Sequence, residues 1–179
     1  GKRVIFHIHS GKFDKFAAGK NKIKNQLEQF KIVVLSSYWR EKLEPILGKV
    51  SVIENPIDPN LQTEDIVDKK PKQILLLGRR DPVKGHRFAF EVVRIMKNDG
   101  WNLKATGTLH NEDGIEGLGW VTEEEKYSLL RESDVLIIPS QYEGQPLVMM
   151  EGLAAECKVV ASDKIPGLPN CVVSAEFNN

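Results

Sequence analysis

One stretch decides the fold class: residues 134–151, which read DVLIIPSQYEGQPLVMME. The run over residues 134–138 is short and apolar and stops at Pro139, which is typical of a strand buried on both faces of a parallel sheet. A turn around Gly144 follows, and Pro146 suits the first position of a helix that we expect over residues 146–155. A buried strand followed by a helix is half of a βαβ unit, so this stretch predicts a parallel sheet.

The same alternation extends in both directions. Short apolar runs predict further strands at residues 3–8, 32–36, 50–53, 73–77, 103–106 and 158–161. Helical patterns predict helices at residues 21–30, 39–47, 84–97 and 122–130, the last opened by a capping box between Thr122 and Glu125. The expected buried face of the helix over residues 84–97 consists of Phe88, Val92, Ile95 and Met96. The predicted fold class is therefore α/β, with a parallel sheet that carries helices on both faces.

A polar segment with prolines divides the chain. Pro56 and Pro59 lie close together, and a largely charged stretch then extends to Lys72. Proline disfavours helix in the residue before it, and a run of charges has little to bury. We therefore place a linker at residues 59–72, between a first domain at residues 1–58 and a second at residues 73–179.

Length and composition exclude several classes of protein. The chain has 179 residues, 25 Lys and Arg against 25 Asp and Glu, and 41% hydrophobic residues, which suffices for a buried core. We find neither a run of eighteen apolar residues nor the apolar core of a signal peptide. The only cysteines, Cys157 and Cys171, are expected to be buried thiols rather than a disulfide. These features predict a cytoplasmic protein.

The zero net charge hides an asymmetry. Residues 1–60 hold 11 basic and 6 acidic side chains, so the rest of the chain carries an acidic excess. The basic excess fits a solvated surface as well as it fits a contact with an anionic membrane or acceptor, and the second alternative implies peripheral binding at the inner face of the membrane. Neither half interleaves its charges with aromatic residues, so we expect no nucleic-acid partner.

A basic turn follows the strand predicted at residues 73–77. Residues 78–85 read GRRDPVKG and lead into the next helix, at the end of the strand where open α/β sheets bind ligands. Arg79 offers a planar fork and Lys84 a point charge, both of which suit a diphosphate. A solvated basic turn is the alternative.

The turn before the helix over residues 146–155 offers an anion site and two carboxylates. The first amides of that helix, at Leu147 and Val148, have no partner in a preceding turn, so they and the helix dipole favour an anion. Glu143 precedes the helix, and Glu151 lies within it among apolar side chains, where a charge needs a reason. One of these carboxylates can reach a sugar bound at the start of the helix, and the other can reach a neighbouring pair of hydroxyl groups. A solvated helix face is the alternative for Glu151.

Together these motifs resemble those of the retaining glycosyltransferases of family 4. The resemblance rests on Gly78-Arg79 with Lys84-Gly85, Pro139-Ser140, the E-x7-E pair Glu143 and Glu151, and Ala161-Ser162 followed by Pro166-Gly167. It implies a GT-B fold of two facing Rossmann-like domains. Residues 1–58 would then be a partial acceptor-side domain, and residues 73–179 most of the nucleotide-sugar domain.

The resemblance also implies how the donor binds. Arg79 and Lys84 would hold its diphosphate, Glu151 the ribose hydroxyls, and Glu143 the hydroxyls of the donor sugar. The amides that would complete the phosphate cradle belong to Gly144, Gln145, Leu147 and Val148.

Five other positions take their expected environment from the same resemblance. Trp120 and Val121 would contact the base, with ordinary packing as the alternative. His9, at the end of the first strand, would lie near the donor sugar, whereas His7 would be packed. Glu156 stands where the family has glycine, so we expect it in the left-handed conformation.

We therefore expect a retaining, metal-independent hexosyltransferase whose only small-molecule partner is the nucleoside-diphosphate sugar donor, with no cofactor. Its acceptor would be a glycan or a lipid-linked sugar in the synthesis of a cell-surface polysaccharide or lipopolysaccharide. No spacing of His, Cys and acidic residues resembles a metal site, and His86 and His110 are expected at the surface. A nucleotide-sugar-binding module without catalysis, a sugar-nucleotide epimerase and a glycan phosphorylase of the same plan are the alternatives.

The three strands predicted before Asn55 have fewer sheet neighbours than the family provides. We therefore expect an open sheet edge, with three alternatives for residues 1–60: they pack abnormally against the second domain, pair with another copy of the chain, or are less ordered than residues 73–162. In each case we expect a chain that binds nucleotide but transfers sugar poorly, if at all. The apolar side chains expected to be exposed in this region are Val4, Phe6, Val33 and Leu35.

Overall fold

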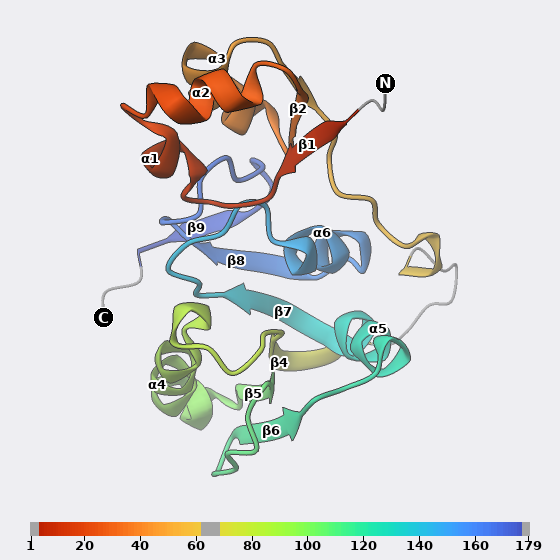
Figure 1. The fold of residues 1–179 in the computed structure, drawn as a ribbon. Coiled ribbons are helices and arrows are strands. Elements are labelled where there is room, and N and C mark those ends of the chain that lie inside the picture. Colours follow the sequence, from red (N-terminus) through yellow and green to blue (C-terminus); the bar gives the residue numbers. More distant parts are fainter. Residues whose placement is uncertain (1–3, 62–68, 177–179) are drawn as a thin grey trace. The chain divides into compact units, whose positions relative to one another are not determined.

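The computed structural model describes residues 4–61 and 69–176, which fall into two units (Figure 1). Unit 1 comprises Gly1–Pro56, Tyr142–Gln145 and Ile165–Gly167, and unit 2 comprises Ile57–Gln141, Pro146–Lys164 and Leu168–Asn179. The predicted start of the first strand at Arg3 and residues 62–68 of the predicted linker lie outside the described residues.

Unit 1 contains a parallel three-stranded sheet with the order β1-β2-β3. Its strands are β1 (Ile5–Ile8), β2 (Lys31–Val34) and β3 (Val50–Val52), and its helices are α1 (Phe13–Ala17), α2 (Asn21–Leu27) and α3 (Ser37–Leu47). Ser36 caps α3 by accepting a hydrogen bond from the amide of Trp39 at 3.4 Å. The core joins the sheet to α2 and α3 and consists of Ile8, Leu27, Ile32, Val34, Trp39, Leu43, Leu47 and Val50.

Two of the four apolar side chains predicted to be exposed in unit 1 are in fact buried. Val4 and Phe6, just before and within the outer strand β1, are 51% and 38% exposed. Val33 and Leu35 are only 4% and 2% exposed, so the prediction for them was wrong. Val33 belongs to the middle strand β2 and Leu35 directly follows it, so neither lies at the open edge of the sheet.

Unit 2 contains a parallel six-stranded sheet with the order β6-β5-β4-β7-β8-β9. The strands are β4 (Lys70–Leu76), β5 (Asn102–Thr106), β6 (Ile115–Gly119), β7 (Ser133–Ile138), β8 (Lys158–Ser162) and β9 (Val173–Ala175). The helices are α4 (His86–Met96), α5 (Glu123–Glu132) and α6 (Leu147–Ala154), with 3-10 turns at Pro59–Leu61, Pro82–Lys84 and Lys97–Asp99. Counted within the unit, the strand order is that of a Rossmann-like sheet, so the predicted α/β class is confirmed.

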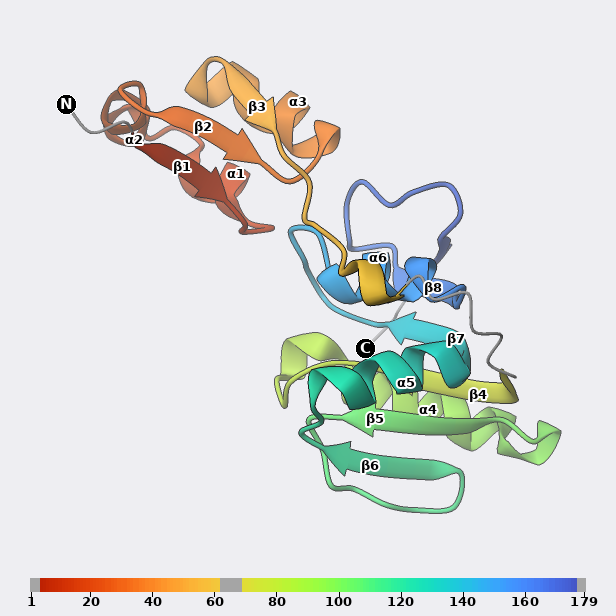
Figure 2. The ribbon, with the colours of Figure 1, turned by 90° about the vertical axis from the view of Figure 1, so that its right-hand side faces the viewer.

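Helices cover both faces of this sheet. Ile74 and Ile137 belong to a cluster with Ala89 of α4 on one face. Leu136 points to the opposite face, where Gly152 of α6 comes so close that a Cβ on it would lie 2.4 Å from the Leu136 Cδ2. Figure 2 shows α5 in front of β4 and β5, with α4 behind them.

The buried face of α4 differs from the predicted one. Ala89 and Val93 are buried, at 0% and 1% exposure, while Ile95 is 79% exposed. The other predicted members, Phe88, Val92 and Met96, are half-buried. The prediction followed the larger apolar side chains, whereas the helix approaches the sheet along its smaller ones.

The ends of α5 and α6 follow local rules that the sequence contains. Thr122 and Glu125 form the predicted capping box at the start of α5. Pro146, expected at the first position of α6, is instead its N-cap residue, with ψ of 118°. Glu156, just after α6, has φ of 59°, as expected for a position where glycine is usual.

Several boundaries and elements were predicted incorrectly or missed. β4 begins at Lys70, so residues 70–72 belong to a strand and not to the predicted linker. The short elements α1, β6 and β9 were not predicted. Cys157 is buried as expected, but Cys171 is exposed, because it lies in a turn before β9 rather than inside a strand.

Candidate functional site

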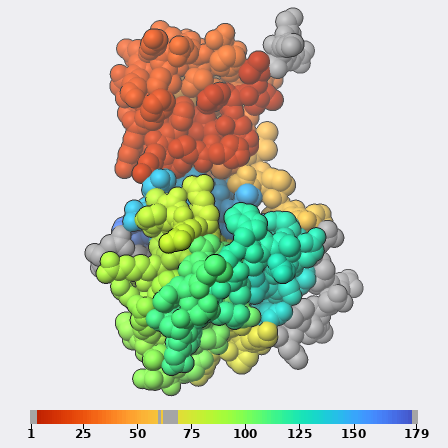
Figure 3. Space-filling view, turned by 60° about the horizontal axis from the view of Figure 1, so that its bottom comes forward, coloured from red at the N-terminus to blue at the C-terminus, as the bar shows by residue number. Residues whose placement is uncertain are grey.

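A pocket of about 450 Å³ lies at the carboxyl ends of β4 and β5 in unit 2. Its lining includes four of the predicted site residues, together with Trp120 and Lys126; the four are Arg79, Lys84, Val121 and Val148. In the space-filling view of Figure 3, the segments near residue 80 (yellow-green) and near residue 120 (teal), which border this pocket, face the viewer. Rossmann-like sheets bind ligands at this end of their strands, close to where the strand order reverses, and β4 is the strand at that reversal.

The turn after β4 brings two cations to the pocket. A Cβ placed on Gly78 would lie 3.3 Å from the side chain of Lys84, so the absence of a side chain there lets Lys84 pack closely against the strand end. Arg79 is largely exposed and its Nη2 lies 3.2 Å from Asp81 Oδ2. Gly85 has φ of 72° and lies so close to the carbonyl oxygen of Pro139 that a Cβ would approach it to 2.4 Å, so this turn requires glycine.

Asp81 orders the basic turn. Its carboxylate accepts a hydrogen bond from the amide of Val83 at 3.0 Å and thereby caps the 3-10 turn that follows. This hydrogen bond and the guanidinium of Arg79 lower the pKa of Asp81. The carboxylate is therefore ionised at neutral pH and holds Arg79 beside the pocket.

The start of α6 contributes backbone donors. Pro146 makes no side-chain cap, so the amides at the first helical positions, Leu147 and Val148, have no partner from a preceding turn of helix. Val148 lines the pocket, whereas the side chain of Leu147 is 48% exposed. The positive end of the α6 dipole and these donors suit an anionic group.

Glu151 lies nearly buried on α6, one turn after Val148. Its Oε1 pairs with Lys126 Nζ at 2.9 Å, and Lys126 also pairs with Glu123 Oε2 at 2.7 Å. The other oxygen, Oε2, is buried and has no hydrogen-bond partner among the described residues. The solvated face considered for Glu151 is therefore wrong. Glu151 is not among the residues that line the pocket, but its partner Lys126 is, and Oε2 is an acceptor that can take a hydroxyl group.

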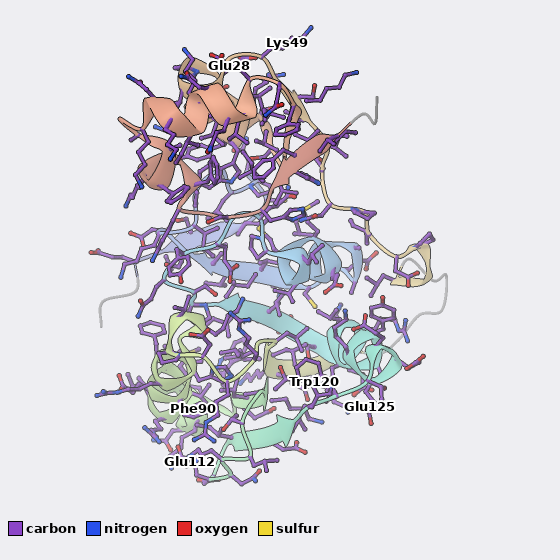
Figure 4. All side chains as sticks on the ribbon, in the orientation of Figure 1. Glu28, Lys49, Phe90, Glu112, Trp120 and Glu125 are labelled. Carbon is purple, nitrogen blue, oxygen red and sulfur yellow. The ribbon has the colours of Figure 1, made fainter. Side chains whose placement is uncertain are left out.

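The turn between β6 and α5 supplies the apolar part of the pocket. Trp120, labelled in Figure 4, is 87% exposed, and Val121 after it is half-buried. Both line the pocket. An exposed indole beside a pocket is a surface on which a planar ring can stack.

The other predicted residues belong to unit 1. His9, Glu143, Gly144 and Gln145 lie there, and the backbone at Gly144 passes so close to His9 that a Cβ on Gly144 would lie 2.2 Å from the His9 carbonyl oxygen. Trp39 Nε1 donates to the Gly144 carbonyl at 2.6 Å. This fixes the backbone after Glu143 within unit 1.

The histidines of β1 and the following turn are both exposed. The prediction that His7 is packed was therefore wrong, and His9 is exposed as well. Their rings lie 4.2 Å apart between centroids. A small loss of hydration and the neighbouring His9 lower the pKa of His7.

Lys126 is the site residue that the sequence reasoning missed. It follows three glutamates in a helix start, where a lysine is read as a surface residue, and only the fold shows that Glu151 lies within reach. His86, predicted at the surface, is instead half-buried, and its Nε2 lies 2.8 Å from the carbonyl oxygen of Thr106. His110 is exposed as predicted.

The described residues contain neither a cluster of metal ligands nor a helix that could span a membrane. Within residues 4–61 and 69–176, no three His, Cys, Asp or Glu side chains cluster in a way that could hold a metal ion. Over the same ranges, no helix has both the length and the apolar character needed to cross a bilayer.

A family model and curated sequences match this chain. The model described as glycosyl transferases group 1 matches residues 59–178. An uncharacterized glycosyltransferase of Haemophilus influenzae is 27% identical over 163 residues, which cover 82% of this chain and 45% of that protein. The amylovoran biosynthesis glycosyltransferase AmsK of Erwinia amylovora is 28% identical over 168 residues, covering 79% of this chain and 41% of AmsK. The chain thus spans less than half the length of these relatives.

Solved structures resemble the fold. A TarM mutant of S. aureus, in complex with fondaparinux, alpha-GlcNAc-glycerol and UDP, superimposes with a TM-score of 0.76 at 22% identity. The superposition covers 98% of this chain and 41% of TarM.

Proposed function

The chain belongs to the group 1 glycosyl transferases, and from this premise we propose that the protein transfers a sugar from a nucleoside-diphosphate donor to a glycan or lipid-linked acceptor, with retention of configuration. As in the family 4 enzymes that its motifs resemble, Glu143 would bind the sugar of the donor and Glu151 would bind its ribose.

One observation carries this proposal: the pocket of unit 2 combines three groups that match the parts of such a donor. Arg79 and Lys84 line it as cations for a diphosphate, and the first turn of α6 adds amide donors. Lys126 of the lining pairs with Glu151, whose other carboxylate oxygen has no partner among the described residues and suits a ribose hydroxyl. A simple phosphate ion would need only the first two of these groups.

The proposed chemistry asks the protein to stabilise charge on the leaving diphosphate. Fixed amides and cations do this without reorganising during the reaction, which is the most effective form of electrostatic stabilisation. In this proposal the acceptor hydroxyl attacks on the face that the phosphate leaves, and an oxygen of the departing phosphate takes its proton. As the family resemblance implies, Glu143 would bind hydroxyls of the donor sugar and His9 would lie near that sugar. That the transfer needs no metal ion remains a prediction.

The relatives support a role in polysaccharide synthesis. AmsK is named for the biosynthesis of amylovoran, and the TarM structure contains UDP. We therefore propose a hexosyltransferase of a cell-surface polysaccharide or lipopolysaccharide.

We also propose peripheral contact with the inner face of the membrane, through the basic side of unit 1. On and around α1 and α2, Lys15, Lys20, Lys22 and Lys24 are exposed, and Phe16 is 54% exposed beneath the ammonium of Lys20. Lysines beside an exposed aromatic ring suit an anionic lipid surface. Sedimentation with vesicles that contain anionic lipid, compared with neutral vesicles, tests this point, and equal binding to both would contradict it.

The main experiment measures donor binding by this chain. UDP, GDP, ADP and their sugar conjugates are compared by thermal shift and calorimetry, since a ligand stabilises the folded chain in proportion to its occupancy. Arg79→Ala and Lys84→Ala should each weaken the best ligand by about 1.5–3 kcal/mol, the value of a charged hydrogen bond. Arg87→Ala serves as the control, because Arg87 is exposed and lies outside this pocket. Failure of all these nucleotides to bind would refute the proposal. In a longer protein, one that contains this sequence and has the full length of the relatives, donor binding without transfer would favour a binding module.

A further inference from the structure

Lys126 joins two acidic side chains beside the pocket. Its Nζ lies 2.9 Å from Glu151 Oε1 and 2.7 Å from Glu123 Oε2. The side chains of Lys126 and Glu151 are 16% and 13% exposed, whereas that of Glu123 is 69% exposed. The pair with Glu151 is thus sheltered from water and salt, and the pair with Glu123 is not.

The contact with Lys126 gives the two carboxylate oxygens of Glu151 different surroundings. Oε1 is held by the ammonium, and the buried Oε2 has no hydrogen-bond partner among the described residues. Leaving a buried carboxylate oxygen without a donor costs stability, so its retention calls for an explanation. The helix itself cannot supply a donor, because the other residues of α6 are apolar or glycine. Lys126, which binds Oε1, lines the pocket, so a ligand bound there can supply a donor.

We propose that Lys126 is a positioning residue, which binds one oxygen of Glu151 so that the other accepts the ribose hydroxyl groups of the donor. This inference rests on the proposed function. An ammonium is a point donor and engages one oxygen here, whereas the fork of an arginine would engage both. Hydrogen bonds to Glu123 and Glu151 outweigh the effect of burial and raise the pKa of Lys126, so it stays charged at neutral pH.

The test compares ligands with and without the ribose hydroxyls. Affinities of the full chain are measured for UDP, GDP and ADP and for their 2′,3′-dideoxy counterparts, in the wild type and in Lys126→Met. The wild type should prefer the best ribonucleotide by about ten-fold or more, the effect of one charge-assisted hydrogen bond. Lys126→Met should reduce that preference at least five-fold, because it weakens binding of the ribonucleotide more than binding of the dideoxy form. Lys158→Met is the matched control, since Lys158 is exposed, pairs with Asp134 and lies outside the pocket.

Each other outcome has a distinct meaning. If Lys126→Met weakens both forms equally, Lys126 attracts the phosphates instead of positioning Glu151, and the inference fails. Retention of the full preference, or a wild type that binds both forms alike, overturns it as well, while the proposed function stands. A wild type that binds none of the diphosphates overturns both. Should Lys126→Met not fold, Lys126→Arg carries the test: it keeps the positive charge, but its fork engages both oxygens of Glu151, so it should reduce the preference for the ribonucleotide. Full retention of the preference in Lys126→Arg would overturn the inference.

Discussion

Replacing Glu156 by glycine should stabilise unit 2 by about 1 kcal/mol. Glu156 follows α6 with φ of 59°, and the helix end is closed by two hydrogen bonds, from Glu156 N to Leu153 O at 3.1 Å and from Cys157 N to Gly152 O at 2.8 Å. This pattern defines a Schellman motif, in which the left-handed residue is usually glycine. The hydrogen bonds that close the helix thus impose the left-handed conformation, which glutamate itself does not favour.

The magnitude follows from three terms. A left-handed L-residue costs roughly 1–2 kcal/mol, which glycine avoids. Glycine returns about 0.4–1 kcal/mol of this through the greater entropy of the unfolded chain. Removing a carboxylate from the negative end of the α6 dipole adds roughly 0.3–1 kcal/mol at low salt. The balance is a gain near 1 kcal/mol, or roughly 2–4 °C in Tm for a chain of this size.

Urea unfolding at low and high salt tests this prediction. Glu156→Ala is the control, because it removes the charge but keeps a Cβ in the left-handed conformation; it should gain only the salt-dependent part. Glu156→Gly should exceed Glu156→Ala by about 0.5 kcal/mol or more at every salt concentration. Equal stability of the two variants would refute the conformational argument. Nucleotide affinity should be unchanged in both, since Glu156 is outside the pocket.

The remaining predictions concern stability, the two glutamates, metal ions and assembly. Lys69→Met should lower the free energy of unfolding, measured with urea, by about 2–3 kcal/mol, because the Lys69 ammonium donates to three carbonyls at the ends of α5 and α6. A change below about 0.5 kcal/mol, the effect of an ordinary surface substitution, would contradict this. Glu151→Gln should weaken free nucleoside diphosphate and sugar donor alike, whereas Glu143→Gln should spare the free nucleotide and reduce turnover of the longer protein; similar losses of free-nucleotide affinity would disprove the division. Transfer by the longer protein should persist in excess EDTA, and its loss with recovery on adding a divalent ion would overturn metal independence. Size-exclusion chromatography with light scattering should show dimers that Phe6→Lys disrupts, because Phe6 lies on the open edge of β1; a monomeric wild type would exclude pairing at that edge.

Local signals in the sequence were sufficient where a few neighbouring residues fix the backbone. The capping box of Thr122 and Glu125 is such a case, since its two hydrogen bonds close within three residues. The turn at Gly78, Arg79 and Lys84 is another, because it follows directly from a strand end. The left-handed Glu156 was expected from a family glycine and is confirmed by its φ.

Short elements with mixed side chains escaped prediction. β6 contains two glycines among its five residues and β9 only three residues, so neither has the apolar run that identifies a strand. Their place at the outer positions of the sheet explains why such sequences suffice, since an outer strand pairs on one side only.

The sequence by itself determined the order of the longer strands and helices, the parallel sheet and the position of the basic turn, because periodicity, caps and turn residues act over a few positions. Only the tertiary structure decided which face of α4 is buried. The helix packs closely on the sheet, and its small residues Ala89 and Val93 allow this approach better than the larger Phe88 and Ile95 do. It also decided the partner of Glu151. Lys126 is 25 residues away along the chain, and no local rule brings an ammonium from the start of α5 to a carboxylate on α6; the strand order does so by placing both helices over β7.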